Sequence, residues 1–200
     1  MERSGEHSRS LVNLLAEMVL IGVGVFLALL ANNWHEEREH RALADSTLRN
    51  FAAEMQANQQ RVKAHRQYHV TFASELNKLL KRKEPLTMDQ LDKTAHFKGM
   101  EPVIFEHTAW DLALATQALS YIKPELAFDI SKVYTQQNAF QTLENSFLAS
   151  AFTPATFASE NIKGLAAAMG GYLEDVNIQE PYILQLYGKV ISEVDSALSH

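Results

Sequence analysis

The sequence has no cysteine, few residues that break helices and no excess of basic charge. Without cysteine the chain can form no disulfide, thiolate zinc site, iron–sulfur cluster or thiol nucleophile. Lys and Arg number 18 against 24 Asp and Glu, which gives a formal net charge of −6. This balance argues against a nucleic-acid partner, because such binding usually needs a basic face. Only 8 glycines and 5 prolines in 200 residues indicate a chain with few turns.

One apolar segment stands out near the N-terminus. Residues 18–31 carry no polar side chain, and the wider segment 11–34 has the length of a bilayer-spanning helix, about 20 residues. Asn32, Asn33 and Trp34 end it with groups typical of the headgroup region. A cleaved signal peptide and a buried core helix are the alternatives. No A-x-A motif follows and the charged residues continue in helical register, so we expect an uncleaved anchor at 11–34 after a short tail at 1–10.

Small and polar residues share one face of this expected anchor. The face is formed by Glu17, Ile21, Gly24, Ala28 and Asn32, which are spaced three or four residues apart. Gly24 and Ala28 form a small-x-x-x-small pair that lets two membrane helices approach closely, although such residues are common in membrane helices by chance. Glu17 is either an intramembrane carboxylate with a function or, in the reading we favour, an interfacial residue that reaches the headgroups.

The orientation in the membrane is weakly encoded. Arg3 and Arg9 precede the segment, whereas Arg38, Arg41 and Arg49 follow it. The positive-inside rule therefore nearly ties. We favour a short N-terminus on the cytoplasmic side of a bacterial inner membrane and a C-terminal domain in the periplasm.

A heptad stripe follows the anchor. Between Gly24 and Pro85 the chain has neither glycine nor proline, which predicts one nearly continuous helix from about residue 11 to 81, loosened near Asp45 and Ser46. Its stripe repeats every three and four residues: Leu48, Phe51, Met55, Asn58, Val62, His65, His69, Phe72, Leu76 and Leu79. We interpret residues 35–83 as a coiled-coil-like helix. Its candidate interaction seam is Leu48, Phe51, Met55, Val62, Phe72 and Leu76, unless the C-terminal helices fold back and cover it.

Residues 84–200 read as a series of helices with few strand signals. Thr87 is expected to cap a helix at 88–93, and Thr108 to Asp111 has capping-box spacing for a helix through Leu119. Pro124 is expected to open a helix at 124–149. Pro154 should open the next, which Gly170 and Gly171 should end, and a last helix at 172–198 should kink or break before Pro181. The sequence therefore predicts an all-α protein: one transmembrane helix continuing into a long helix, then an antiparallel helical bundle that packs with part of it.

Two stretches resemble a group of bacterial single-pass membrane proteins. The first is Glu17-x-x-Leu20-x-Gly22-x-Gly24-x-x-x-Ala28-Leu29-x-x-Asn32-Asn33-Trp34-x-Glu36-Glu37-Arg38, which is similar to the apolar helix and charged continuation that open those proteins. The second stretch, residues 108–134, is similar to a recurring block of those proteins. This chain departs from the block at one position, where it has Gln117 and the block often has glycine. The resemblance implies a membrane anchor. The group has no assigned activity, so the resemblance implies no catalytic residue.

Clusters of chemically active residues have plain structural explanations. The run His35-Glu36-Glu37-Arg38-Glu39-His40 is not an H-E-x-x-H motif and fits a solvated collar beside the membrane. His65 and His69 have the spacing of two metal ligands but no evident third ligand, so we expect them in the seam, with a metal site or a pH switch as the alternative. The pair Glu106 and His107 more often caps a helix than catalyses.

The aromatic residues and the absence of catalytic motifs also favour a protein without a catalytic site. The residues Trp110, Tyr121, Tyr134, Tyr172, Tyr182 and Tyr187 could line a ligand pocket but more often fill a core. No glycine-rich phosphate loop, G-x-S-x-G or S-x-x-K motif occurs. We therefore predict no catalytic, cofactor or metal residues. The expected function is a membrane-anchored scaffold or interaction module whose partners are the bilayer and a second copy or another membrane protein; the alternative is a ligand-binding sensor domain that acts through a membrane partner.

Overall fold

The protein is all-α, as predicted. A computed structural model describes residues 4–95, 97–151, 153, 156, 158 and 161–199. Its elements are α1 (Ser4–Leu80), α2 (Met88–Ala95), α3 (Thr108–Ala115), the short 3-10 helix η1 (Ala118–Tyr121), α4 (Pro124–Ala151) and α5 (Ile162–Leu198). No strand occurs among these described residues. The chain divides into two units, Met1–Ala44 and Asp45–His200, and α1 contributes to both.

The first unit is the N-terminal part of α1, which is long and apolar enough to cross a membrane. An 18-residue window reaches a mean hydropathy of 1.7, and none of that window is buried inside the protein. The helix carries no glycine or proline after Gly24, so its hydrogen-bonded backbone continues through Asp45 and Ser46, where the sequence suggested loosening.

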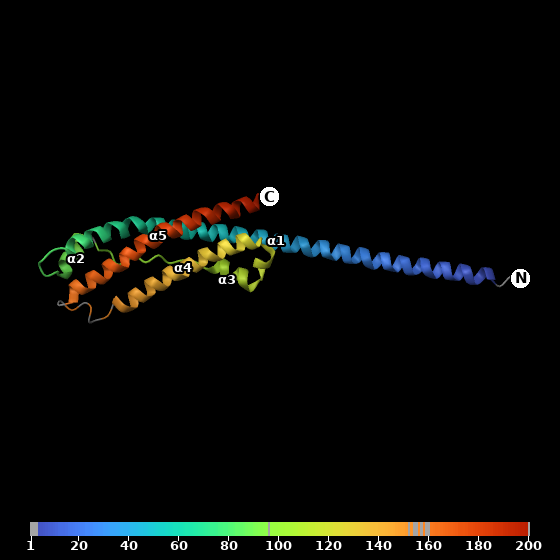
Figure 1. Cartoon of the computed structure of the whole chain (residues 1–200), viewed down its shortest axis with the longest axis horizontal. Coiled ribbons are helices and arrows are strands. Elements are labelled where there is room, and N and C mark those ends of the chain that lie inside the picture. The colour runs from blue at the N-terminus through green and yellow to red at the C-terminus, as the bar shows by residue number, and fades with distance from the viewer. Residues whose placement is uncertain are drawn as a thin grey trace. The chain divides into compact units, whose positions relative to one another are not determined.

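The second unit is a helical bundle formed by the rest of α1 with α4 and α5. Figure 1 shows α5 running in the opposite direction to α4 and to the bundle part of α1. Helix α4 packs against α5, α2 lies at one end of this bundle, and α3 and η1 lie toward the other end (Figure 1). The core register of each long helix repeats every three or four residues, as amphipathic helices require. Along α5 the buried residues are Ile162, Leu165, Ala166, Met169, Tyr172, Leu173, Val176, Glu180, Ile183, Tyr187, Val190 and Val194.

The heptad stripe of α1 is the centre of this core. The seam residues Leu48, Phe51, Met55, Val62, Phe72 and Leu76 are all buried within the single chain. The surface expected to meet another chain is therefore occupied by the chain's own helices, which is the alternative that the sequence left open. The physical reason is length: α4 and α5 span 28 and 37 residues, enough to cover a stripe from Leu48 to Leu79.

The N-termini of α2 and α3 are capped differently, the first by a residue close in sequence and the second by a residue of another helix. Thr87 caps α2 in a reciprocal capping box: its Oγ1 accepts from Gln90 N at 3.2 Å and its own N donates to Gln90 Oε1 at 3.0 Å. The predicted box at Thr108 is wrong. His107 holds the N-cap position of α3 without a side-chain cap, and Ala109 N instead donates to Glu54 Oε2 of α1 at 2.8 Å.

The predicted helix end at Gly170 and Gly171 is wrong, and the chain does not break before Pro181. Helix α5 runs unbroken through Gly170, Gly171 and Pro181. Gly170 lies against α1: a Cβ placed there would make ordinary van der Waals contacts with Leu80 Cδ1 at 3.6 Å and Leu76 Cδ2 at 3.9 Å. Glycine costs a helix about 1 kcal/mol, and burial of the continuous apolar register of α5 offsets that cost. The predicted start at Pro154 lies outside the described residues.

Candidate functional site

The predicted anchor residues lie exposed along the first unit. Glu17, Gly24 and Ala28 have no cover from the chain, and a Cβ placed on Gly24 would meet nothing within 4 Å. Asn32 Nδ2 donates to Glu36 Oε1 at 2.7 Å, one turn further along the helix. The face that carries these residues is therefore open for contact with lipid or another helix.

The charged collar after the anchor consists of contacts along the helix. The Arg38 guanidinium lies 4.8 Å from the ring centroid of Trp34. Exposed pairs one turn apart join His35 to Glu39 at 3.2 Å and Arg41 to Glu37 at 3.3 Å. Such exposed pairs contribute only about 0.3–0.5 kcal/mol each. The geometry is that of a solvated collar and brings no residues together for catalysis.

The strongest concentration of buried polar groups lies in the bundle, around His69 of α1. We define the His69 cluster as His69, Glu144 of α4, and Tyr172 and Glu180 of α5. His69 Nδ1 lies 2.6 Å from Glu180 Oε1, and both side chains are fully buried. Three helices thus place titratable groups inside one core, where charge is expensive unless it is paired.

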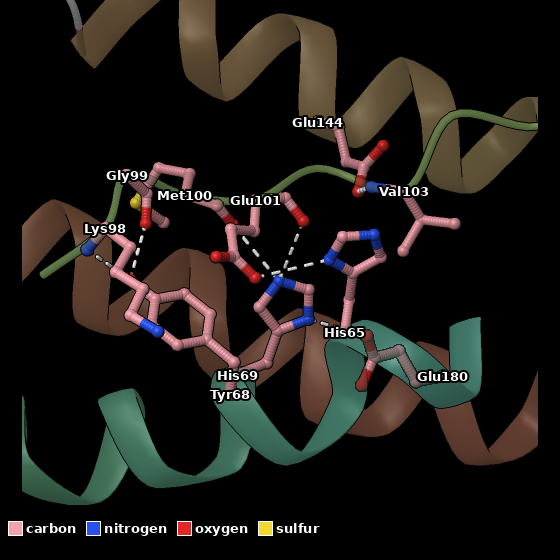
Figure 2. A network of polar contacts seen from close by, with 10 residues as sticks. All are labelled: His65, Tyr68, His69, Lys98, Gly99, Met100, Glu101, Val103, Glu144 and Glu180. Atoms are coloured by element: carbon pink, nitrogen blue, oxygen red, sulfur yellow. Dashed lines mark hydrogen bonds and ion pairs between the residues drawn. The ribbon is translucent and has the colours of Figure 1, made fainter. Parts of the chain in front are cut away.

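Both ring nitrogens of His69 face acceptors. While Nδ1 meets Glu180, Nε2 lies 3.1 Å from each of the carbonyl oxygens of Met100 and Glu101 (Figure 2). A neutral imidazole has one N–H, so only the imidazolium can donate in both directions. Burial disfavours the imidazolium, but the hydrogen bond and charge of Glu180 and the two carbonyls outweigh it and raise the pKa of His69 above its ordinary value.

Glu144 supplies the second buried carboxyl group. Its Oε1 accepts from Val103 N at 2.9 Å and from the Tyr172 hydroxyl at 3.3 Å. Burial raises the pKa of Glu144 to about 7, against the hydrogen bonds and the positive charge of His69. Burial and the nearby Glu144 also raise the pKa of Tyr172, which stays a neutral donor.

Two members of the cluster, His69 and Glu144, bind the backbone of residues 97–107, and Glu180 and Tyr172 hold these two in turn. We call this stretch between α2 and α3 the connecting segment. Figure 2 shows it running between α1, which carries His69, and α4, which carries Glu144. It has no strand partner, so side chains must satisfy its backbone polar groups. Tyr68 donates to Gly99 O at 2.6 Å and accepts from Lys98 N at 3.0 Å.

The far end of the connecting segment is fixed in the same manner. The Asn58 side chain donates to Glu106 O and accepts from Glu106 N, both at 2.9 Å. Glu54 continues the series: it accepts from Ala109 N at 2.8 Å and from the Tyr134 hydroxyl at 2.7 Å. Buried polar residues of α1 therefore read as backbone clamps for this segment and for the start of α3.

The connecting segment has an unusual backbone where His69 grips it. Gly99 has φ of 97° and Glu101 has φ of 45°, both in the left-handed region. Glycine enters this region freely, whereas another residue there costs about 1–2 kcal/mol. Glu101 keeps the conformation because its carbonyl is held by His69 and its carboxylate lies 3.3 Å from His65 Nδ1.

The candidate metal and acid–base pairs are separated by their partners. The rings of His65 and His69 stack with centroids 6.2 Å apart, but His65 turns to Glu101 and His69 to Glu180. Among the residues the structure describes, no group of three His, Cys, Asp or Glu has metal-binding geometry. Glu106 pairs with Arg61 of α1, whereas His107 Nε2 lies 3.3 Å from Gln141 of α4, so these two side chains diverge.

The aromatic residues divide between core and surface. Tyr134, Tyr172 and Tyr187 are buried, whereas Tyr121 and Tyr182 are exposed. Trp110 packs on the Tyr134 ring with centroids 5.1 Å apart. The core interpretation is therefore right for three of the tyrosines.

Sequence reasoning missed the carboxylates of the site. Glu144 continues the register of Ile130, Val133, Gln137 and Phe140 on α4, and Glu180 that of Val176 and Ile183 on α5. A charged residue in a core register of period three and four was the available signal. Among the described residues, three buried side-chain atoms of α4 and α5 have no hydrogen-bond partner: Gln137 Oε1, Asn177 Oδ1 and Glu180 Oε2.

No protein-family model, curated protein or solved structure matches this chain. The resemblance of residues 11–50 to bacterial single-pass proteins consequently stays an interpretation of the residues themselves.

Proposed function

We propose that the chain is a membrane-anchored interaction module without catalytic activity. Residues 11–34 hold it in a bilayer, and the bundle of residues 45–200 is presented to a protein partner. The observation that carries this proposal is the apolar window of α1, which has a mean hydropathy of 1.7 and no cover from the chain. Exposed apolar surface costs about 25 cal/mol per Å² in water, so a run of this length calls for lipid.

The use of polar groups in the bundle supports a non-enzymatic role. A nucleophile or general base must reach a substrate. Here the buried groups Glu54, His69 and Glu144 are engaged with backbone N–H or C=O groups of the same chain. Their hydrogen-bonding groups hold the connecting segment and α3 in place.

We place the protein in a bacterial inner membrane as a single-pass protein with the bundle in the periplasm. The resemblance of residues 11–50 supports the bacterial membrane. Because Arg3 and Arg9 before the segment are matched by Arg38, Arg41 and Arg49 after it, the orientation we favour rests on the short N-terminal tail, which can stay inside while the large C-terminal part is exported. Protease protection of the bundle in intact and permeabilised cells tests this orientation.

Self-association through the anchor is the interaction we favour. In lipid, apolar bulk gives no preference for a helix over acyl chains, so close approach at small residues must drive contact. Gly24 and Ala28 provide such a site, and the space around the Gly24 Cβ position is open in the single chain. With the heptad stripe covered inside the bundle, the anchor becomes the main surface available for this purpose.

Cross-linking in native membranes tests the proposal with a matched pair of variants. Gly24→Ile should reduce the cross-linked dimer several-fold, because the branched side chain separates the helices. Gly22→Ile is the control: Gly22 is also open, but two residues along a helix place it about 200° away from Gly24. Equal cross-linking in wild type and both variants, or a monomeric wild type at all expression levels, contradicts self-association through this face.

A sensor domain is the second candidate, and the His69 cluster is the observation that favours it. This cluster joins titratable groups from α1, α4 and α5 and binds one segment of backbone. The stimulus that such a site fits is the proton.

A further inference from the structure

Both ring nitrogens of His69 face oxygen atoms, an arrangement that suits an imidazolium, which can donate from Nδ1 and Nε2 together. Nδ1 faces Glu180 at 2.6 Å, and Nε2 faces the carbonyls of Met100 and Glu101 at 3.1 Å each. We propose that the connecting segment is a pH-gated strap, held between α1 and α4 by the imidazolium of His69 and released when that imidazolium loses a proton. The inference rests on the geometry of the bundle alone, so it stands whether or not the anchor self-associates.

The direction of release follows from what each side of the ring faces. After deprotonation one nitrogen carries a lone pair toward an acceptor, and that contact becomes repulsive. Glu180 is fully buried, and its Oε2 already lacks a hydrogen-bond partner. A buried carboxylate left without any donor costs more than a carbonyl that can turn to water. The remaining N–H therefore stays with Glu180, and the carbonyls of Met100 and Glu101 are let go.

The backbone of the strap is poised to move once this contact is lost. Glu101 has φ of 45°, a conformation that a non-glycine residue keeps only where its surroundings hold it. On either side of Glu101 the strap buries apolar side chains, namely Met100 before it and Val103 and Phe105 after it. The ring centroid of Phe105 lies 5.7 Å from that of Phe140 on α4. Release of the strap thus uncovers an apolar groove along α1 and α4.

The groups that surround His69 set the pH range. His65 and Tyr68 lie beside it on α1, Glu101 faces it from the strap, Glu144 from α4, and Tyr172 and Glu180 from α5. The hydrogen bond and charge of Glu180, with the two strap carbonyls, raise the pKa of His69 above its ordinary value of about 6.5 while the strap is held. The strap is therefore fully held below about pH 6.5 and is lost as the pH rises through the raised pKa.

Hydrogen exchange of the full-length protein in detergent or nanodiscs measures strap release directly. Peptides that cover residues 97–107 are followed from about pH 5.5 to 8.5, with rates normalised to the intrinsic exchange of the same peptides. Because release is linked to one proton, protection of the strap should fall by up to about tenfold per pH unit across the transition. Peptides from α4 should keep constant protection. Constant protection of the strap across this range overturns the proposal without any variant.

Three variants locate the proton. His69→Gln removes the titrating group. The strap should then be weakly protected from hydrogen exchange at every pH, with no pH-dependent transition. His65→Gln and Glu144→Gln should lower the protection of the strap at every pH, because these side chains contact Glu101 and Val103, but both should retain the transition. The second variant matters because the pKa of Glu144, about 7, lies in the same range. A transition that survives His69→Gln or disappears in Glu144→Gln contradicts the assignment. If His69→Gln does not fold, an imidazole NMR titration of the wild type decides, since the His69 shift must change at the same pH as strap protection.

Discussion

The two halves of α1 belong to one helix but differ in whether their apolar side chains are exposed or buried. Up to Ala44 the described side chains are almost all exposed, including Phe26 at 61%. From Asp45 onward the apolar side chains of the stripe are buried, including Phe51 at 0%. The difference teaches that helical backbone and apolar content do not decide what covers a helix. Periodicity does: a run that is apolar on every side suits lipid, whereas a stripe suits a bundle.

The polar residues of the two halves differ in the same way. In the first half, charged groups pair along the helix and stay in solvent, as His35 and Glu39 do. In the second half, Asn58 and His69 point into the core and bind backbone from another part of the chain. The bundle thus uses polar side chains for tertiary structure, whereas pairs such as His35 and Glu39 in the first half connect only neighbouring turns of one helix.

Truncation of one phenylalanine in each half should give the largest contrast. Phe51→Ala leaves a cavity beside Trp110 and Tyr134, whose ring centroids lie 6.2 and 5.7 Å from that of Phe51, and should lower the free energy of unfolding by about 3–5 kcal/mol. Phe26→Ala should change it by less than about 0.5 kcal/mol. Denaturant titration of the full chain in detergent, followed by near-UV circular dichroism, measures both. Similar losses in the two variants would break the comparison.

The pH dependence of stability should come from the bundle and not from the anchor. The folded state raises the pKa of Glu144 to about 7 from about 4.5, so it binds a proton that the unfolded chain has lost. Stability should therefore fall between about pH 4.5 and 7, by roughly 2–3 kcal/mol, and continue to fall as His69 loses its proton.

Two glutamine variants identify the source of this fall. Glu144→Gln should flatten the decline between pH 4.5 and 7, whereas Glu17→Gln in the anchor should leave it unchanged. Denaturant midpoints measured at several pH values provide the comparison. Stability that rises over this range in the wild type would show that Glu144 is ionised in the folded protein.

A substitution that relieves backbone strain should change the free energy of unfolding the least. Gln117 lies between α3 and η1 with φ of 56°, in the left-handed region that favours glycine. Gln117→Gly should raise the free energy of unfolding by about 0.5–1 kcal/mol. Gly24→Ala, in a helical position of the anchor, should leave unfolding of the bundle unchanged. A loss of stability in Gln117→Gly would mean that its side chain contributes more than its backbone conformation costs.

Local signals in the sequence were enough for most of the fold. The glycine- and proline-free stretch predicted α1, Pro124 predicted the start of α4, and Thr87 predicted the capping box of α2. Signals that depend on tertiary contacts were misleading. Gly170 and Gly171 look like a helix end until α1 is seen to pack against Gly170, and the α3 start is capped by Glu54 from a distant part of the chain.

The candidate site was only half predictable. The stripe placed His69 in the core correctly, but its partners Glu180 and Glu144 are 111 and 75 positions away along the chain. A lone carboxylate in an apolar register gives no hint of which histidine or backbone amide it meets. The left-handed Glu101 was also beyond prediction, because the conformation depends on contacts with α1.

Spin-label accessibility in nanodiscs tests the central claim most directly, that one helix passes from lipid to a bundle in water. The chain has no cysteine, so Val25→Cys and Ala53→Cys each give a single labelling site on an exposed position of α1. The account predicts that a nitroxide at position 25 collides with oxygen, which dissolves in lipid, more often than with a water-soluble nickel chelate. At position 53 the preference should reverse. Equal preference for the nickel chelate at both positions would contradict the account.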